Sequence, residues 1–290
     1  MLVDELAWLA LSLQPHIGSK TLSQLLAHFG SASGILAASP DDLQQVRGIG
    51  AKLAAAIKSI NLETVDHQCQ QWARAGVQLL PHYHAHYPLA LRTLEDAPAS
   101  LFVYGDILLR LPQKAVAVIG TRQPSPVAQQ AAYRLGRLLA DSGLLVVSGM
   151  ATGIDAAAHE GALSVPNGVT LAMLGSGVLR PYPPQNRKLA QRVSQHGALA
   201  CECAPDATPN APRLVSRNRL ITGMATEGVI IVESAADGGA MHAARFAQAQ
   251  GRPLFTLDLP ASGNQALIEA GVMPLAPDIA DIDFLTQIAD

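Results

Sequence analysis

Small and polar residues of the kind that bind phosphate recur directly after predicted strands. The loop Gly120–Ser125 follows the apolar run Ala115–Ile119, and the loop Ser148–Asp155 follows the apolar run Leu144–Val147. Glycine lets a ligand approach the backbone, and arginine offers a fork of donors to phosphate oxygens. Helices that begin after such loops direct unpaired N–H groups at the same place. These residue types and their spacing predict a phosphate site.

Two later segments add polar and basic side chains after predicted strands. Tyr182–Asn186 follows the turn Gly175–Gly177, and Arg217–Arg219 follows a proline-rich loop. The window from Arg180 to Leu220 holds seven basic and two acidic residues, a local charge of +5 on a chain of net charge −3. This distribution favours an anion-binding face on an acidic body. The residues expected to contact phosphate or DNA are Gly120, Thr121, Arg122, Ser125, Ser148, Gly149, Met150, Gly153, Asp155, Tyr182, Asn186, Lys188, Arg217, Asn218 and Arg219.

Apolar runs alternate with helical patterns from Ala115 onward, which predicts an α/β fold with an extended Rossmann-like, doubly wound and mostly parallel sheet. Ser125-Pro126 is typical of a helix start and Gly143 of a helix end, and we expect Asp155 to cap the second helix. In such a sheet, ligands bind outside the carboxyl ends of the strands, where the polar loops would meet. The expected strands are residues 115–119, 144–147, 169–174, 199–203, 229–232 and 254–257. The buried face expected for the first helix carries Val127, Ala131, Leu135 and Leu138.

Residues 1 to about 65 show apolar spacing typical of helices, with glycine and proline between the apolar runs, which predicts a small all-α domain. Arg47-Gly48-Ile49-Gly50 resembles a helix-hairpin-helix turn, in which glycines let backbone N–H groups approach a DNA phosphate. A simple connecting turn in a packing domain is the alternative, and the residues leave both open. We expect domains at 1–65 and 66–275, with 66–110 as an N-terminal extension of the second. Residues 276–290 would form a tail without a complete winged-helix domain.

Composition excludes several classes of protein. Apolar residues make up 49% of the chain, enough for a sizeable core, and no run approaches the ~20 apolar residues that span a bilayer. Three cysteines give no disulfide framework and the N-terminus lacks signal-peptide features, which favours the reducing cytoplasm. Cys201 and Cys203 would alternate in a strand, and His82, His84 and His86 lie in a loop between prolines. We therefore expect neither a metal nor a cofactor.

The loops depart from the patterns of common Rossmann-type enzymes. The first loop lacks Gly-x-Gly-x-x-Gly, and Ser148-Gly149 stands where dinucleotide-binding proteins carry an acid for the ribose. No segment resembles the nucleophile elbow of a hydrolase. An enzyme or sensor for a small nucleotide derivative, similar to a phosphoribohydrolase, stays open as an alternative. Gly238-Gly239 follows Glu233, although the Gly-Thr part of that class's signature is absent.

Four motifs together resemble the DNA-processing protein A (DprA/Smf) family. The resemblance runs in the same order from about Trp72 to Gly271, and the helical segment before it resembles the small sterile-alpha-motif-like (SAM-like) domain of many members. The motifs are Gly120-Thr-Arg-Gln-Pro-Ser125, Ser148-Gly-Met-Ala-Thr-Gly-Ile-Asp-Ala-Ala-Ala-His159, Tyr182-Pro-Pro-Gln-Asn186 and Arg217-Asn-Arg-Leu-Ile221.

The resemblance implies a homodimeric DNA-binding protein that is not an enzyme. It would bind single-stranded DNA, protect incoming DNA during natural transformation and load the recombinase RecA. The DNA would cross the predicted phosphate site, with Arg122 and the loop Ser148–Gly153 near its backbone and Tyr182 stacked on a base. Gly238-Gly239 stands where the family usually has Gly-Ser, so one hydroxyl is missing. The N-terminal helical domain is a candidate site for duplex DNA or a protein.

Overall fold

The structure is a computed structural model that describes residues 3–105 and 112–286. The chain divides into two compact units. Residues 1–102 with 202–204 form the N-terminal unit, and residues 103–201 with 205–290 form the sheet unit.

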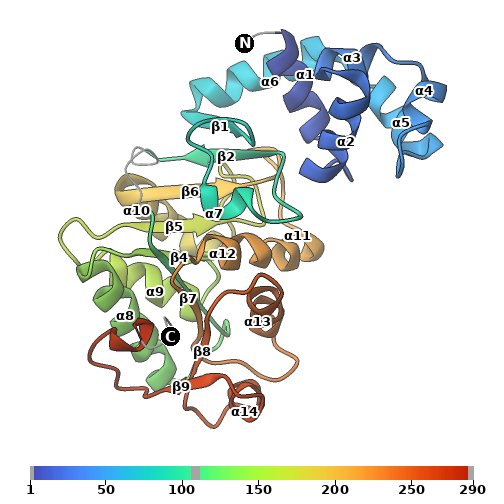
Figure 1. The fold of residues 1–290 in the computed structure, drawn as a ribbon. Coiled ribbons are helices and arrows are strands. Elements are labelled where there is room, and N and C mark those ends of the chain that lie inside the picture. The colour runs from blue at the N-terminus through green and yellow to red at the C-terminus, as the bar shows by residue number, and fades with distance from the viewer. Residues whose placement is uncertain (1–2, 106–111, 287–290) are drawn as a thin grey trace. The chain divides into compact units, whose positions relative to one another are not determined.

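Short helices build most of the N-terminal unit (Figure 1). Side chains of Ser31, Ser39 and Asn61 accept backbone N–H groups at the starts of α3, α4 and α6, which satisfies donors that a first helical turn leaves unpaired. The elements are α1 (Val3–Ser12), α2 (Ser19–Phe29), α3 (Ala32–Ala37), α4 (Pro40–Gln44), α5 (Ala51–Lys58), α6 (Leu62–Arg74), β1 (Val77–Pro81), α7 (Leu89–Arg92) and β2 (Ser100–Tyr104), whose last two residues belong to the sheet unit.

The core of the N-terminal unit lies between these helices. Leu22 and Ile35 are fully buried in it, and Trp8 packs beside them. The indole Nε1 of Trp8 donates to the Ala99 carbonyl and to Ser100 Oγ, both at 3.2 Å. A large aromatic side chain whose only donor is satisfied anchors α1 to the chain segment at β2.

The sheet unit contains seven parallel strands within its described residues, in the order β6-β5-β4-β3-β7-β8-β9. All five residues of β3 are buried, because it lies in the middle with β4 on one side and β7 on the other. Ala117 is paired with Val147 and with Val229. The strands are β3 (Ala115–Ile119), β4 (Leu145–Ser148), β5 (Thr170–Met173), β6 (Gly197–Cys201), β7 (Gly228–Ile231), β8 (Leu254–Leu257) and β9 (Met273–Leu275).

Helices cover both faces of this sheet (Figure 1). α8 and α9 pack on β3 and β4, while α12 packs on β3, β4 and β5 with α13 beside it. The doubly wound, mostly parallel α/β fold expected from the sequence is confirmed. The helices are α8 (Pro126–Asp141), α9 (Ile154–Ala162), α10 (Arg187–His196), α11 (Ala211–Ser216), α12 (Asn218–Met224), α13 (Ala240–Ala249) and α14 (Ser262–Glu269), with 3-10 turns at Pro184–Asn186 and Asp283–Leu285.

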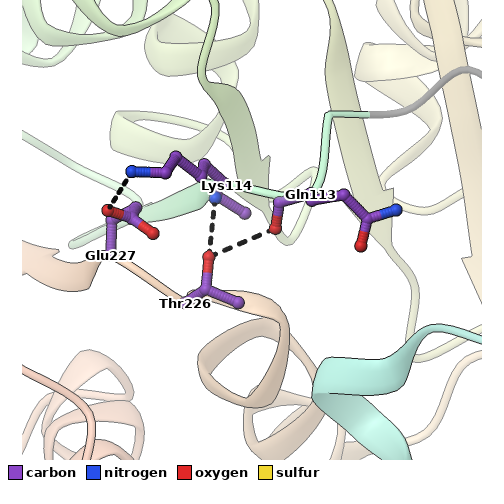
Figure 2. A network of polar contacts seen from close by, with 5 residues as sticks. Gln113, Lys114, Thr226 and Glu227 are labelled. Carbon is purple, nitrogen blue, oxygen red and sulfur yellow. Dashed lines mark hydrogen bonds and ion pairs between the residues drawn. The ribbon is translucent and has the colours of Figure 1, made fainter.

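A polar network joins the amino ends of β3 and β7 (Figure 2). The hydroxyl of Thr226 accepts the Ala115 N–H at 2.9 Å and donates to the Gln113 carbonyl at 3.3 Å. Lys114 Nζ lies 3.6 Å from a carboxylate oxygen of Glu227. These contacts align the two central strands at one edge of the sheet, so that their carboxyl ends meet at the opposite edge.

The two helices α8 and α9 approach each other through glycines. A Cβ at Gly136 would overlap the Ala158 carbonyl, and one at Gly161 would overlap the Tyr133 carbonyl. The expected helix start is confirmed, because Ser125 Oγ accepts the Ala128 N–H. The buried face was predicted wrongly at its first position. Val127 is 53% exposed, and the close contact with α9 is made instead through alanine and glycine.

Other elements differ from the sequence expectation in placement. β6 begins at Gly197 and ends at Cys201, so Cys203 lies outside the strand in which it was expected to alternate. α14 and β9 were not expected at all. Part of the tail expected in 276–290 lies outside the described residues. No helix in the described segments is both long and apolar enough to cross a lipid bilayer.

Candidate functional site

A cavity of about 560 Å³ opens at the carboxyl ends of β3 and β7. The strand order reverses between these two strands, and such a switch point is where doubly wound sheets bind ligands. The cavity is lined by Gly120–Gln123 after β3, by residues between Ser234 and Ala240 after β7, and by residues of α11 and α12. We call it the switch-point cavity.

A smaller cavity of about 190 Å³ lies over the carboxyl end of β4. Gly149, Thr152, Tyr182 and Gln185 line it, so it joins the loop after β4 to the segment before α10. We call it the β4 cavity. The two cavities share four lining residues, and the charged ones are both arginines. The shared residues are Arg122, Ala151, Leu214 and Arg217.

The loop that carries Arg122 is held at both ends by one residue, Glu233. The Thr121 N–H donates to the Glu233 carbonyl at 2.8 Å, and the Ser125 N–H donates to its carboxylate Oε2 at 2.7 Å. Arg122 itself is exposed, and its guanidinium has no hydrogen bond or ion pair with the described residues. A cation on a fixed loop at the rim of two cavities suits a phosphate ligand.

Arg217 is buried beneath the same place, with 5% of its surface exposed. Its Nη1 donates to the Gly149 carbonyl and, at 2.6 Å, to the Met173 carbonyl. It therefore joins the ends of β4 and β5. Burial lowers the pKa of the guanidinium from its usual value, which the charge of Asp155 opposes and that of Arg122 reinforces. The side chain nevertheless stays charged, because an arginine pKa starts far above neutral pH.

Asp155 is buried in the first turn of α9 but does not cap that helix, which corrects the expectation. Its Oδ2 accepts the N–H groups of Gly149 at 3.1 Å and Ala151 at 3.2 Å, so it holds the loop before the helix. Burial raises the pKa of the carboxyl, although Arg217 and the two amides act to lower it. Sequence spacing could not reveal this role, since the partners precede the helix.

The glycines of these loops are needed because other atoms of the protein lie where a side chain would be, which the sequence did not reveal. A Cβ at Gly120 would lie 2.6 Å from Ile154 Cγ1, and one at Gly149 would lie 2.5 Å from Arg217 Cζ. Gly153 has a φ of +79°, and a Cβ there would lie 2.5 Å from the Thr121 carbonyl oxygen. The protein's own atoms therefore fill the space that we had expected a ligand to use at these positions.

The predicted site residues fall into two groups. Gly120, Thr121, Arg122, Asp155, Arg217 and Asn218 line the switch-point cavity, and Gly149 and Tyr182 line the β4 cavity together with the two arginines. The residues that line neither cavity are Ser125, Ser148, Met150, Gly153, Asn186, Lys188 and Arg219.

Several residues of the second group support the loops. The fully buried Ser148 donates to the Val118 carbonyl at 2.6 Å, so its hydroxyl proton is already used. Asn186 Nδ2 donates to the Met150 carbonyl at 2.8 Å, which ties the segment before α10 to the loop after β4. Lys188 is exposed on α10. Glu233 was missed as a site residue because its partners lie more than a hundred positions away.

Comparison with known proteins identifies the family. Residues 78–283 match the profile of DNA recombination-mediator protein A. The chain belongs to this family. Residues 7–62 also match the helix-hairpin-helix motif, in agreement with the turn seen at Arg47–Gly50 in the sequence.

Individual relatives cover most of this chain. The chain is 31% identical over 259 residues to Protein Smf of Synechocystis, covering 88% of this chain and 64% of that protein. It is 32% identical over 201 residues to DNA processing protein DprA of Bacillus subtilis, covering 68% of this chain and 67% of that protein. The chain therefore spans about two thirds of the length of these relatives.

Two solved structures resemble this chain. The DNA processing protein A of Streptococcus pneumoniae shares its fold, with a TM-score of 0.78 over 95% of both chains at 24% identity. A DNA processing protein A from Helicobacter pylori, described for its single-stranded DNA binding mode, has a TM-score of 0.64 at 30% identity, over 73% of this chain and 95% of its own.

Proposed function

We propose that this member of the DNA recombination-mediator protein A family binds single-stranded DNA along the rim shared by the two cavities. The observation that carries the proposal is the exposed Arg122, which stands between both cavities without a protein partner among the described residues. The buried Arg217 lies beneath it and adds positive charge. A DNA backbone laid along this rim would bring a phosphate to Arg122.

Tyr182 provides the second contact in this proposal. It is partly exposed and lines the β4 cavity, next to the rim. An aromatic ring beside a cationic groove is a common arrangement in proteins that bind single strands without sequence preference, because every base can stack on it. The H. pylori relative, described for binding single-stranded DNA, supports this choice of ligand.

A shift assay with an oligothymidylate at several salt concentrations tests the proposal. Arg122→Ala should weaken binding and reduce the salt dependence of log K by roughly 0.7, the value for one phosphate contact on a single strand. Arg137→Ala is the matched control, because Arg137 is exposed on α8 and lines neither cavity. Equal affinity and salt slope for wild type and Arg122→Ala would refute this placement of the DNA.

We further propose that the chain acts as a homodimer, does not itself catalyse a reaction, and delivers the recombinase RecA to the DNA it holds. The family description as a recombination mediator supports this role. Light scattering of the free protein tests the dimer. RecA assembly on single-stranded DNA, measured with wild type and with Arg122→Ala, tests delivery. A monomer in solution would refute the proposed dimer. RecA assembly that the protein does not accelerate would refute the proposed delivery of RecA.

The N-terminal helical domain, residues 1–65, is proposed as a separate contact surface for duplex DNA or a protein. Its match to the helix-hairpin-helix motif supports this assignment. Deletion of residues 1–65, followed by shift assays with single- and double-stranded DNA and a RecA binding assay, tests it. A loss confined to duplex DNA or to RecA identifies the partner, and unchanged binding in all three assays refutes the assignment.

A further inference from the structure

A groove of about 550 Å³ lies between α8 and α9, which are side by side in the fold (Figure 1). Residues between 126 and 133 of α8 form one wall, and residues between 153 and 160 of α9 form the other. None of these lining residues lines the switch-point cavity or the β4 cavity. We propose that this α8–α9 groove is a docking surface for a partner protein, which inserts a short amphipathic helix with an acidic side. The inference does not depend on where DNA is bound.

The groove runs along two helices that point in the same direction. α8 follows β3 and α9 follows β4, and these neighbouring strands are parallel, so both helices run back along the sheet together. The lining positions recur at spacings of three and four, at 126, 129, 130 and 133 in α8 and at 153, 156, 157 and 160 in α9. One face of each helix therefore forms a wall. Seven residues of helix span about 10 Å, which is two turns of a third helix.

The α9 side of the groove is made mostly of small residues, so a docked helix can approach closely. Gly153, Ala156 and Ala157 line it and carry at most a methyl group. At the far end α9 touches α8, because a Cβ at Gly161 would overlap the Tyr133 carbonyl. Helices pack by setting the side-chain ridges of one helix into the grooves of another, at a distance that depends on side-chain size. Two touching helices leave a furrow on their exposed side, and a third helix fits such a furrow.

The α8 side of the groove offers apolar anchors. Tyr133 lines the groove with 41% of its surface exposed. Pro126 is also exposed, and Val127 beside it is 53% exposed. Gln129 and Gln130 add a polar rim. Exposed apolar side chains with a polar rim mark interaction surfaces, and tyrosine is enriched among the residues that carry binding energy, so this wall suits the apolar face of a partner helix.

Charge decides which amphipathic helix fits. Arg137 lies one turn after Tyr133 on the same face of α8, is exposed, and has no ion pair with the described residues. On the α9 side, the carboxylate of Glu160 is already paired with Arg192 at 2.7 Å. Asp141 lies a further turn along α8, beyond the residues that line the groove. The groove-lining carboxylate is compensated and Arg137 is not, so this end favours carboxylates of a partner.

The opposite end of the groove also favours negative charge. α8 and α9 both begin there, at Pro126 and Ile154, and a helix dipole places partial positive charge at its amino end. Asp155 is the acid in the first turns of these two helices, but it is buried and its Oδ2 accepts the Gly149 and Ala151 amides. An acidic segment is therefore favoured at both ends of the groove.

The test uses the full chain and a synthetic peptide of about 14 residues, close to the shortest length at which a helix is stable in water. Its leucines recur at spacings of three and four, and glutamate and alanine fill the other positions. Fluorescence anisotropy of the labelled peptide measures binding. Wild type should bind it about tenfold more tightly than a version with lysine in place of glutamate, and more tightly than a scrambled version whose leucines share no face.

Two exposed residues of α8 are exchanged in turn, and circular dichroism checks that each variant folds. Arg137→Glu should weaken binding of the acidic peptide about tenfold, because an uncompensated cation becomes an anion. Tyr133→Ala should weaken it about fivefold or more, whereas Tyr133→Phe keeps the ring and should bind as wild type does. Arg245→Glu is the matched control and should leave binding unchanged, since Arg245 is exposed on α13 and lines neither the groove nor the two cavities.

The proposal is overturned if wild type does not bind the acidic peptide, if it binds the lysine or scrambled version equally well, or if Arg137→Glu or Tyr133→Ala binds like wild type. It is also overturned if these two variants weaken oligothymidylate binding in a shift assay, because the groove would then hold DNA. Arg122→Ala should lower oligothymidylate affinity and leave peptide affinity unchanged. A wild-type protein that binds the peptide but no oligothymidylate would refute the rim proposal alone.

Discussion

The guanidinium of Arg217 occupies the space that a side chain on Gly149 would need. A Cβ at Gly149 would lie 2.5 Å from Cζ and 2.7 Å from Nη2, and would overlap Nη1, which donates to the carbonyl of the same glycine. Arg217 also binds the Met173 carbonyl. The ends of β4 and β5 are therefore joined by a buried cation that fits only because residue 149 lacks a side chain.

Gly149→Ala should consequently destabilise the protein. The added methyl group displaces the guanidinium from both carbonyls or moves the loop, and overpacking of this kind costs about 1–3 kcal/mol. Urea denaturation measures the change. Gly239→Ala is the matched control, because its Cβ would meet no atom within 4 Å and its φ is −59°. Equal free energies of unfolding for the two variants would contradict the role assigned to Arg217.

This pair shows where sequence reasoning about the site succeeds and where it stops. The motifs placed Gly149 and Arg217 at one edge of the sheet, and the structure brings them together there. From the sequence, we expect Gly149 to leave room for a ligand. In the structure, the group that leaves no room for a side chain is the guanidinium of Arg217, 68 positions later. A single sequence contains no signal for such a contact, because periodicity reports only on neighbours along the chain.

The fold was predictable to the extent that local patterns are strong. β3 and β8 were expected at their observed residues, since each is an apolar run bounded by polar or glycine-containing segments. β9 is three residues long and contains Pro274, which removes one donor, so no local pattern marked it. β6 begins two residues early at Gly197, where a Cβ would overlap the Thr170 carbonyl of β5.

Glu233 offers a test of how the loop carrying Arg122 is held. Glu233→Gln keeps an oxygen that accepts the Ser125 N–H and removes a negative charge, so single-stranded DNA affinity should be equal to or higher than that of wild type. Glu233→Ala removes the acceptor, leaves the Ser125 N–H unpaired, and should lower the affinity through a displaced Arg122. A shift assay measures both. An affinity that rises equally in the two variants would mean that only the charge of Glu233 matters.

Tyr182 provides a test of base stacking. Tyr182→Ala should weaken oligothymidylate binding by about 1–3 kcal/mol, while Tyr182→Phe, which keeps the ring, should stay near wild type. Shift assays at one salt concentration are sufficient, because stacking contributes little to the salt dependence. A loss of the same size in both variants would assign the contribution to the hydroxyl and refute stacking.

His159 provides a test in the core, beneath the site. The residue is fully buried on α9, and its Nδ1 lies 2.7 Å from Thr170 Oγ1. The Thr170 hydroxyl donates its one proton to the Val146 carbonyl at 2.7 Å, so it must accept from His159. Neutral His159 therefore carries its proton on Nδ1. Nε2 has no partner among the described residues, and burial, with a smaller effect of Arg217, lowers the pKa of the imidazole to about 3.

The lowered pKa of His159 makes the folded protein less stable as the pH falls. Below a pKa of about 6.5 the unfolded chain binds a proton at His159, whereas the folded chain does not until about pH 3. The free energy of unfolding therefore falls by about 2–3 kcal/mol between pH 7 and 4.5 because of His159, whereas above pH 7 this residue causes no loss. His159→Gln keeps a donor for Thr170 and cannot titrate, so its free energy of unfolding should fall less over this interval. Parallel pH profiles for wild type and His159→Gln in chemical denaturation would show that His159 ionises normally in the folded protein.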